Sequence, residues 1–134
     1  MAQPVFARQL GYFAKNGIAL GGIDPVAYFR QGGLQKGNAS WQIDRQGVTW
    51  VFVSAENLSV FESDPNCYAP QFGGHCAYGM SEAMLVAPDP SAFVIHNDRL
   101  YLMASTAYRD LWRDDPASRI MRGRANWAIL TSES

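Results

Sequence analysis

The clearest secondary-structure signal in the sequence is the stretch Phe93-Val94-Ile95-His96-Asn97-Asp98-Arg99-Leu100-Tyr101-Leu102. Apolar side chains alternate on both sides of Asn97-Asp98, a pair that tolerates the backbone angles of a tight turn. Placing the turn there pairs Ile95 with Leu100 and Phe93 with Leu102, so four apolar side chains share one face. The stretch therefore predicts a β-hairpin with one apolar face.

Similar signals predict further elements on both sides of this hairpin. Capping residues, proline at the first helical position and apolar periodicity mark the helices, whereas β-branched and aromatic runs mark the strands. The expected elements are a helix at 24–30, strands at 41–44 and 49–53, a helix at 54–63, a loop at 66–74, a short helix from 76, the hairpin, and helices from 105 and 115. This order predicts an α+β fold, in which two antiparallel hairpins pack with short helices and a C-terminal helical pair.

The bulk composition predicts one globular domain. The chain has 134 residues, of which 48% are apolar and 17% charged, enough to bury a core without a second domain. Its net charge of -1 and the lack of a basic run exclude a nucleic-acid partner, and no apolar run is long enough to span a membrane. Residues Ala2-Gln3-Pro4 resemble a mature terminus after signal removal, so a periplasmic or exported location is expected, with the cytoplasm as the alternative.

Chemistry is suggested most strongly by Cys76, Met80 and Met84, which are spaced four apart. On a helix this spacing aligns three sulfur atoms on one face. Thiolate and thioether are soft ligands that favour Cu(I), and the neutral imidazole of His75 is a further candidate ligand. Gly73-Gly74 before these residues allows close approach of the backbone. The sequence therefore predicts a copper site built on Cys76, with His75 and Met80 as helpers.

Two other interpretations of Cys76 stay open. It is a buried thiol, or a partner of Cys67 in a disulfide worth about 2.5 kcal/mol by loop closure, in a non-catalytic structural or interaction domain with an unknown protein partner. Alternatively it is the reactive thiol of an enzyme or small-molecule binder, in a pocket walled by aromatic residues such as Tyr78. No catalytic motif is present, and the four Cys and His residues lack the paired spacing of a structural zinc site.

Three separated motifs, taken together, resemble stand-alone YHS-domain proteins. They are Gly22-Ile23-Asp24-Pro25-Val26-Ala27-Tyr28-Phe29, then Tyr68-Ala69-Pro70-Gln71-Phe72-Gly73-Gly74-His75-Cys76-Ala77, then Leu100-Tyr101-Leu102 with Asn126-Trp127. The resemblance implies an N-terminal extension at 1–18, a YHS-like domain at 19–130 and a tail at 131–134.

The same resemblance implies a small α+β domain, often exported from bacterial cells, with a role in metal handling suggested by modules attached to heavy-metal transporters. The family's cysteine falls on Cys76, and its aspartate-proline helix start falls on Asp24 and Pro25, as a cap and a first turn. The chain departs from the pattern in four ways. It lacks the cysteine pair of the transporter-linked modules, and it has His75 where an aromatic residue is expected. It also has Asn97-Asp98 in place of an Asp-Gly turn, and an additional cysteine, Cys67.

Overall fold

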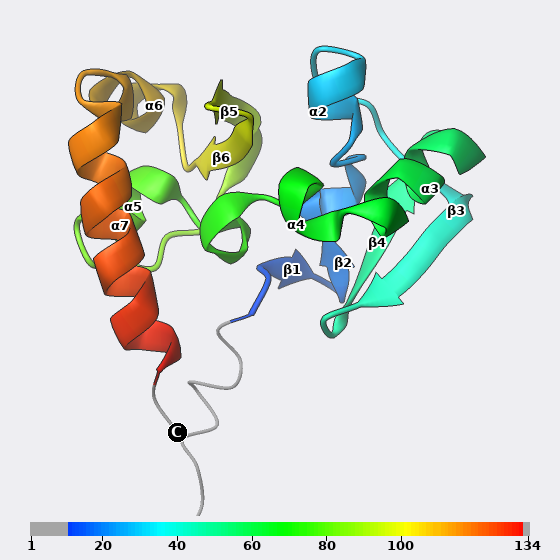
Figure 1. Ribbon diagram of the computed structural model, residues 1–134, viewed down its shortest axis with the longest axis horizontal. Coiled ribbons are helices and arrows are strands. Elements are labelled where there is room, and N and C mark those ends of the chain that lie inside the picture. The colour runs from blue at the N-terminus through cyan, green and yellow to red at the C-terminus, as the bar shows by residue number, and fades with distance from the viewer. Residues whose placement is uncertain (1–10, 133–134) are drawn as a thin grey trace, which may run out of the picture.

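The computed structural model describes residues 11–132 and confirms the α+β fold. The N-terminal sheet, with helices α2 and α3, lies on one side of the molecule, and the hairpin β5–β6 lies on the other side with helices α5, α6 and α7 (Figure 1). Helix α4 (Pro65–Tyr68) lies between these two parts (Figure 1). Among the described residues, no helix is both long and apolar enough to cross a bilayer.

The N-terminal part is built on a sheet of four strands in the order β1-β2-β4-β3. Strands β3 (Asn38–Arg45) and β4 (Val48–Phe52) form the predicted hairpin, with Gln46 and Gly47 at its turn in the left-handed region. Strand β4 is largely buried. The short strands β1 (Ala14–Lys15) and β2 (Ile18–Ala19) add to its other edge, β2 running parallel to β4. Residues 11–18, expected as an extension, thus supply most of this edge.

The buried side chain of Asp24 joins several segments of the N-terminal part through hydrogen bonds. The short 3-10 turn η1 (Leu20–Gly22) precedes it and helix α2 (Ala27–Arg30) follows it. One carboxylate oxygen accepts hydrogen bonds from the backbone N–H groups of Val26 and Ala27, and the other accepts from Val53 N and Asn57 Nδ2. The cap predicted at Asp24 is therefore present, although the regular helix begins two residues later than proline at the first position implies.

Helix α3 (Ala55–Ser63) begins as predicted, because the Ser54 side chain accepts a hydrogen bond from Asn57 N. The following stretch is more ordered than the expected loop at 66–74. It contains the single turn α4 and the 3-10 turn η2 (Gln71–Gly74). Composition predicted the turn-rich character of this stretch, while its helical turns depend on contacts with distant residues.

The hairpin of β5 (Asp89–His96) and β6 (Arg99–Met103) has the predicted register, with Phe93 opposite Leu102 and Ile95 opposite Leu100. Strand β6 packs into two hydrophobic clusters, one on each of its faces. Leu100, Leu102 and Phe93 pack into the N-terminal cluster, which also contains Trp50, Phe52 and Phe61. Tyr101 and Met103, on the opposite face of β6, pack into a second cluster beneath the C-terminal helices. We call this second group the C-terminal cluster.

Helices α6 (Thr106–Arg113) and α7 (Pro116–Thr131) form the predicted C-terminal pair. Ser105 and Asp115 cap them, accepting hydrogen bonds from Tyr108 N and Ser118 N. The inner face of α7 carries four residues at helical spacing: Ile120, Gly123, Trp127 and Leu130. This face packs on α5 and η2 and so covers the segment that carries Cys76.

Candidate functional site

The segment that carries Cys76 makes a sharp turn before the short helix α5 (Ala77–Ser81). Phe72, Gly73 and Gly74 are all in the left-handed region. A Cβ atom added to Gly73 would lie 2.4 Å from the Gly11 carbonyl oxygen, so this close approach requires glycine. The backbone of Gly73 also accepts a hydrogen bond from Phe13 N at 2.7 Å. The close backbone approach predicted at this glycine pair is therefore present.

Cys76 is the N-cap residue of α5, and its Sγ accepts a hydrogen bond from Gly79 N at 3.4 Å. Met80 N in turn donates to the Cys76 carbonyl oxygen at 2.9 Å, which places the two side chains one turn apart. Both side chains are fully buried in the C-terminal cluster, together with the fully buried Met103 of β6. The structure thus places the predicted Cys76 and Met80 in one cluster and adds Met103, which spacing along the sequence did not indicate.

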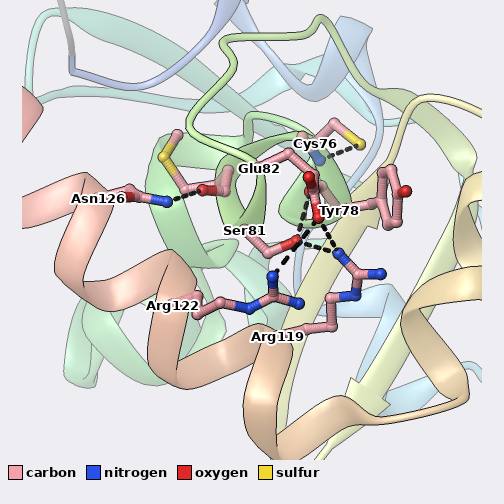
Figure 2. Close-up of polar contacts among 9 residues, drawn as sticks. Cys76, Tyr78, Ser81, Glu82, Arg119, Arg122 and Asn126 are labelled. Atoms are coloured by element: carbon pink, nitrogen blue, oxygen red, sulfur yellow. Dashed lines mark hydrogen bonds and ion pairs between the residues drawn. The ribbon is translucent and has the colours of Figure 1, made fainter.

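Three polar side chains on α7 attach α5 and the residues that follow it (Figure 2). Asn126 Nδ2 donates to the Met80 carbonyl oxygen at 2.7 Å. Arg119 donates to Ser81 Oγ at 3.1 Å and forms an ion pair with Glu82, which Arg122 also approaches at 3.6 Å.

The Arg119 guanidinium also lies over the Tyr78 ring, 4.4 Å from its centroid. Arg119 and Glu82 are 37 residues apart, so no local pattern in the sequence predicts their ion pair. It holds the Cys76–Met80 turn at a fixed position on α7.

The ring of His75 lies among aromatic side chains. Its centroid is 5.9 Å from that of Phe13 and 5.8 Å from that of Trp127. Burial lowers the pKa of His75, and a hydrogen bond to the backbone of Gly11 opposes this shift only in part. Its Nε2 atom is buried and has no hydrogen-bond partner among the described residues. The imidazole is therefore neutral near pH 7 and has an unpartnered nitrogen.

Backbone geometry directs His75 and Cys76 to different surroundings. Both residues have extended ψ angles, of 158° and 121°, and successive side chains of extended backbone point to opposite sides. The imidazole contacts Phe13 and Trp127, whereas the thiol packs within the C-terminal cluster. The described contacts thus do not join the two predicted ligands.

Met84 does not continue the predicted row of three sulfur atoms. Helix α5 ends at Ser81, and Ala83 is in the left-handed region with φ of 60°. Met84 N and Ala83 N donate to the carbonyl oxygens of Gly79 and Met80, the pattern of a Schellman motif. Met84 is 44% exposed. The prediction failed because this motif has alanine where glycine usually signals a helix end.

The two cysteines are both free thiols in the structure. Cys67 is half-buried on α4, and its Sγ accepts a hydrogen bond from Arg99 Nη1 at 3.4 Å. Tyr78, which the enzyme hypothesis places in the wall of a pocket beside Cys76, stacks on Tyr108 with ring centroids 4.7 Å apart. Because the Cys76 side chain has no exposed surface, a substrate has no direct access to its thiol in this conformation.

The donor types narrow the choice of metal. Among residues 11–132, no three His, Cys, Asp or Glu side chains gather in a group that could hold a metal ion. A site at Cys76 would therefore depend on the thioether sulfur atoms beside it, which are ligands for Cu(I) and not for hard cations.

No protein-family model matches this chain, and neither a curated protein nor a solved structure shows significant similarity to it. The resemblance to YHS-domain proteins thus stays a prediction that rests on the sequence motifs alone.

Proposed function

We propose that this protein is a small soft-metal-binding module that holds Cu(I) through Cys76 and Met80, with Met103 as a third ligand. The observation that supports the proposal is that these three sulfur-bearing side chains are all fully buried in one cluster. Thiolate and thioether are the donor types that Cu(I) prefers. We place this function in the periplasm, because the resemblance to YHS-domain proteins implies export.

The charge of the ion suits these surroundings. One Cys76 thiolate and one Cu(I) ion form a neutral pair, while the two thioethers add no charge. Burying a net charge in an apolar cluster is costly, so a divalent ion with a single thiolate is disfavoured here. The hydrogen bond from Gly79 N to Cys76 Sγ would support the bound thiolate, as outer hydrogen bonds do in metal sites.

His75 has a subsidiary part in this proposal. Its neutral ring and unpartnered Nε2 are suited to coordination, but its described contacts are with Phe13 and Trp127. We therefore place His75 outside the set of sulfur ligands and expect its removal to weaken binding less than removal of Cys76.

The second candidate is a non-catalytic structural or interaction domain. Its support is the role of Cys76 as a buried N-cap residue, because a thiol that packs and caps a helix needs no metal. This candidate predicts that Cys76→Ser and Cys76→Ala change stability without changing any metal affinity.

A titration of the reduced protein with Cu(I) against a competing chelator separates the two candidates. We expect a one-to-one complex that Cys76→Ala and Met80→Leu weaken strongly and that His75→Ala weakens less. Cys67→Ser is the matched control, because it removes the other thiol and should leave the affinity unchanged. Equal weak binding by the wild type and Cys76→Ala would contradict the metal module and favour the structural domain.

A further inference from the structure

A hollow of about 610 Å³ lies between helix α7 and the turn end of the β5–β6 hairpin. The hairpin contributes His96, Arg99 and Tyr101, while α7 contributes Ile120, Met121 and Arg124. His96 pairs directly with Arg99, and Tyr101 follows two residues later, so the three side chains share one face of the hairpin. Met121 and Arg124 are three apart on α7 and share one face of that helix. We call this hollow the arginine groove.

The arginine groove is lined by two arginines, Arg99 and Arg124, and by no Asp or Glu. Among the described residues, neither Arg99 nor Arg124 has a carboxylate within ion-pair distance. On the same helix, Arg119 and Arg122 both pair with Glu82. The positive charge in the groove is therefore uncompensated, although the chain as a whole has a net charge of -1.

Cys67 holds one of these side chains in place. Arg99 Nη1 donates to Cys67 Sγ at 3.4 Å, which positions its guanidinium. Tyr101 lies on the same face of the hairpin and also lines the groove. Its phenolic O–H can donate a hydrogen bond to an anion held by the two arginines. Two cationic groups and one hydroxyl then converge on one space.

The groove also has an apolar wall. Met121 is 70% exposed, and Ile120 lies beside it on the side that meets the C-terminal cluster. An exposed methionine next to paired cationic groups suits a ligand with a charged end and an apolar body. Inorganic phosphate alone would leave this wall unused.

We propose that the arginine groove binds a small organic anion, whose carboxylate or phosphate group contacts Arg99 and Arg124 and whose apolar part lies on Ile120 and Met121. Organic carboxylates and organic phosphates both combine such an anionic group with an apolar part. The inference is independent of copper, because no proposed sulfur ligand lines the groove.

Chemical-shift titrations of the ¹⁵N-labelled, copper-free protein test the proposal. The probes are benzoate, phenyl phosphate, inorganic phosphate and benzyl alcohol. We expect saturable shifts at the amides of Arg99, Tyr101 and residues 117–124 with benzoate or phenyl phosphate, and their relative strength shows which anion is preferred. The proposal would be overturned if neither benzoate nor phenyl phosphate gave saturable shifts. It would also be overturned if benzyl alcohol gave equal shifts, or if inorganic phosphate bound as tightly as the preferred organic anion.

Variants of α7 supply the control. Arg124→Gln should weaken binding of the preferred probe about tenfold or more, the loss expected for a charge-assisted hydrogen bond. Arg122→Gln removes the same charge from the same helix outside the groove and should leave the affinity nearly unchanged. Equal weakening by both variants would show that binding follows general surface charge, and would overturn the assignment of the groove. Circular dichroism of each variant confirms that it is folded.

Discussion

Asp24 is fully buried, and its carboxylate accepts four hydrogen bonds from three different segments of the chain. Asp24→Ala leaves these donors without partners, so we expect the free energy of unfolding to fall by about 3 kcal/mol or more in chemical denaturation. Asp44 is the matched control, because it is exposed and accepts a single side-chain hydrogen bond from Thr49. Asp44→Ala should cost less than about 1 kcal/mol. Equal losses would contradict the role given to Asp24.

His75 should make stability depend on pH. Its pKa is lowered in the folded protein by burial, so below the unfolded pKa the unfolded chain binds a proton that the folded protein does not. The free energy of unfolding should therefore fall as the pH drops from about 6.5 towards the folded pKa, and level off below it. His75→Gln should remove this part of the pH dependence. Urea denaturation across this pH range measures the free energy of unfolding. Identical plots of this free energy against pH for wild type and His75→Gln would contradict the prediction.

At the scale of single elements, Gly123 decides how closely α7 packs. A Cβ atom at this position would lie 2.8 Å from Phe72 Cζ. Helix propensity alone predicts that Gly123→Ala stabilises α7 by about 1 kcal/mol, whereas overpacking predicts a loss of about 1–3 kcal/mol. We expect a net loss in thermal or chemical denaturation. The exposed Ala125→Gly measures the propensity contribution in the same helix, and a net gain for Gly123→Ala would contradict the packing.

The elements differ in how far the sequence could predict them. The β5–β6 hairpin and the caps Ser54, Ser105 and Asp115 depend on neighbours a few residues away, and the structure confirms them. Strands β1 and β2 have two residues each and exist through pairing with one another and with β4, so no local pattern announces them.

The candidate site shows the same division. Local spacing predicted that Cys76 and Met80 lie one helical turn apart, and the hydrogen bond from Met80 N to the Cys76 carbonyl oxygen confirms this spacing. It could not reveal Met103, which comes from β6, or the attachment of Arg119 to Glu82 across 37 residues. The same local spacing wrongly extended the predicted helix to Met84. The helix ends earlier in a Schellman motif, which has Ala83 in place of the glycine that usually marks such an end.

At the scale of the whole molecule, the hairpin β5–β6 connects the two hydrophobic clusters. Leu102 and Met103 are both fully buried and lie on opposite faces of β6, in the N-terminal and C-terminal clusters respectively. Because one strand belongs to both clusters, we expect a single cooperative unfolding transition. Leu102→Ala and Met103→Ala should each lower the free energy of unfolding by about 2–5 kcal/mol. Far-UV and near-UV circular dichroism should report coincident transitions, and a separate transition for one cluster would contradict this connection.

The central proposal is that buried sulfur atoms bind Cu(I). The most direct test is the copper K-edge X-ray absorption spectrum of the reduced protein with equimolar Cu(I), recorded for wild type, Cys76→Ser and Cys67→Ser. We predict that sulfur dominates the first shell of the wild type and Cys67→Ser, and that Cys76→Ser loses the thiolate contribution. A first shell of nitrogen and oxygen in the wild type, or identical spectra for wild type and Cys76→Ser, would contradict the proposal.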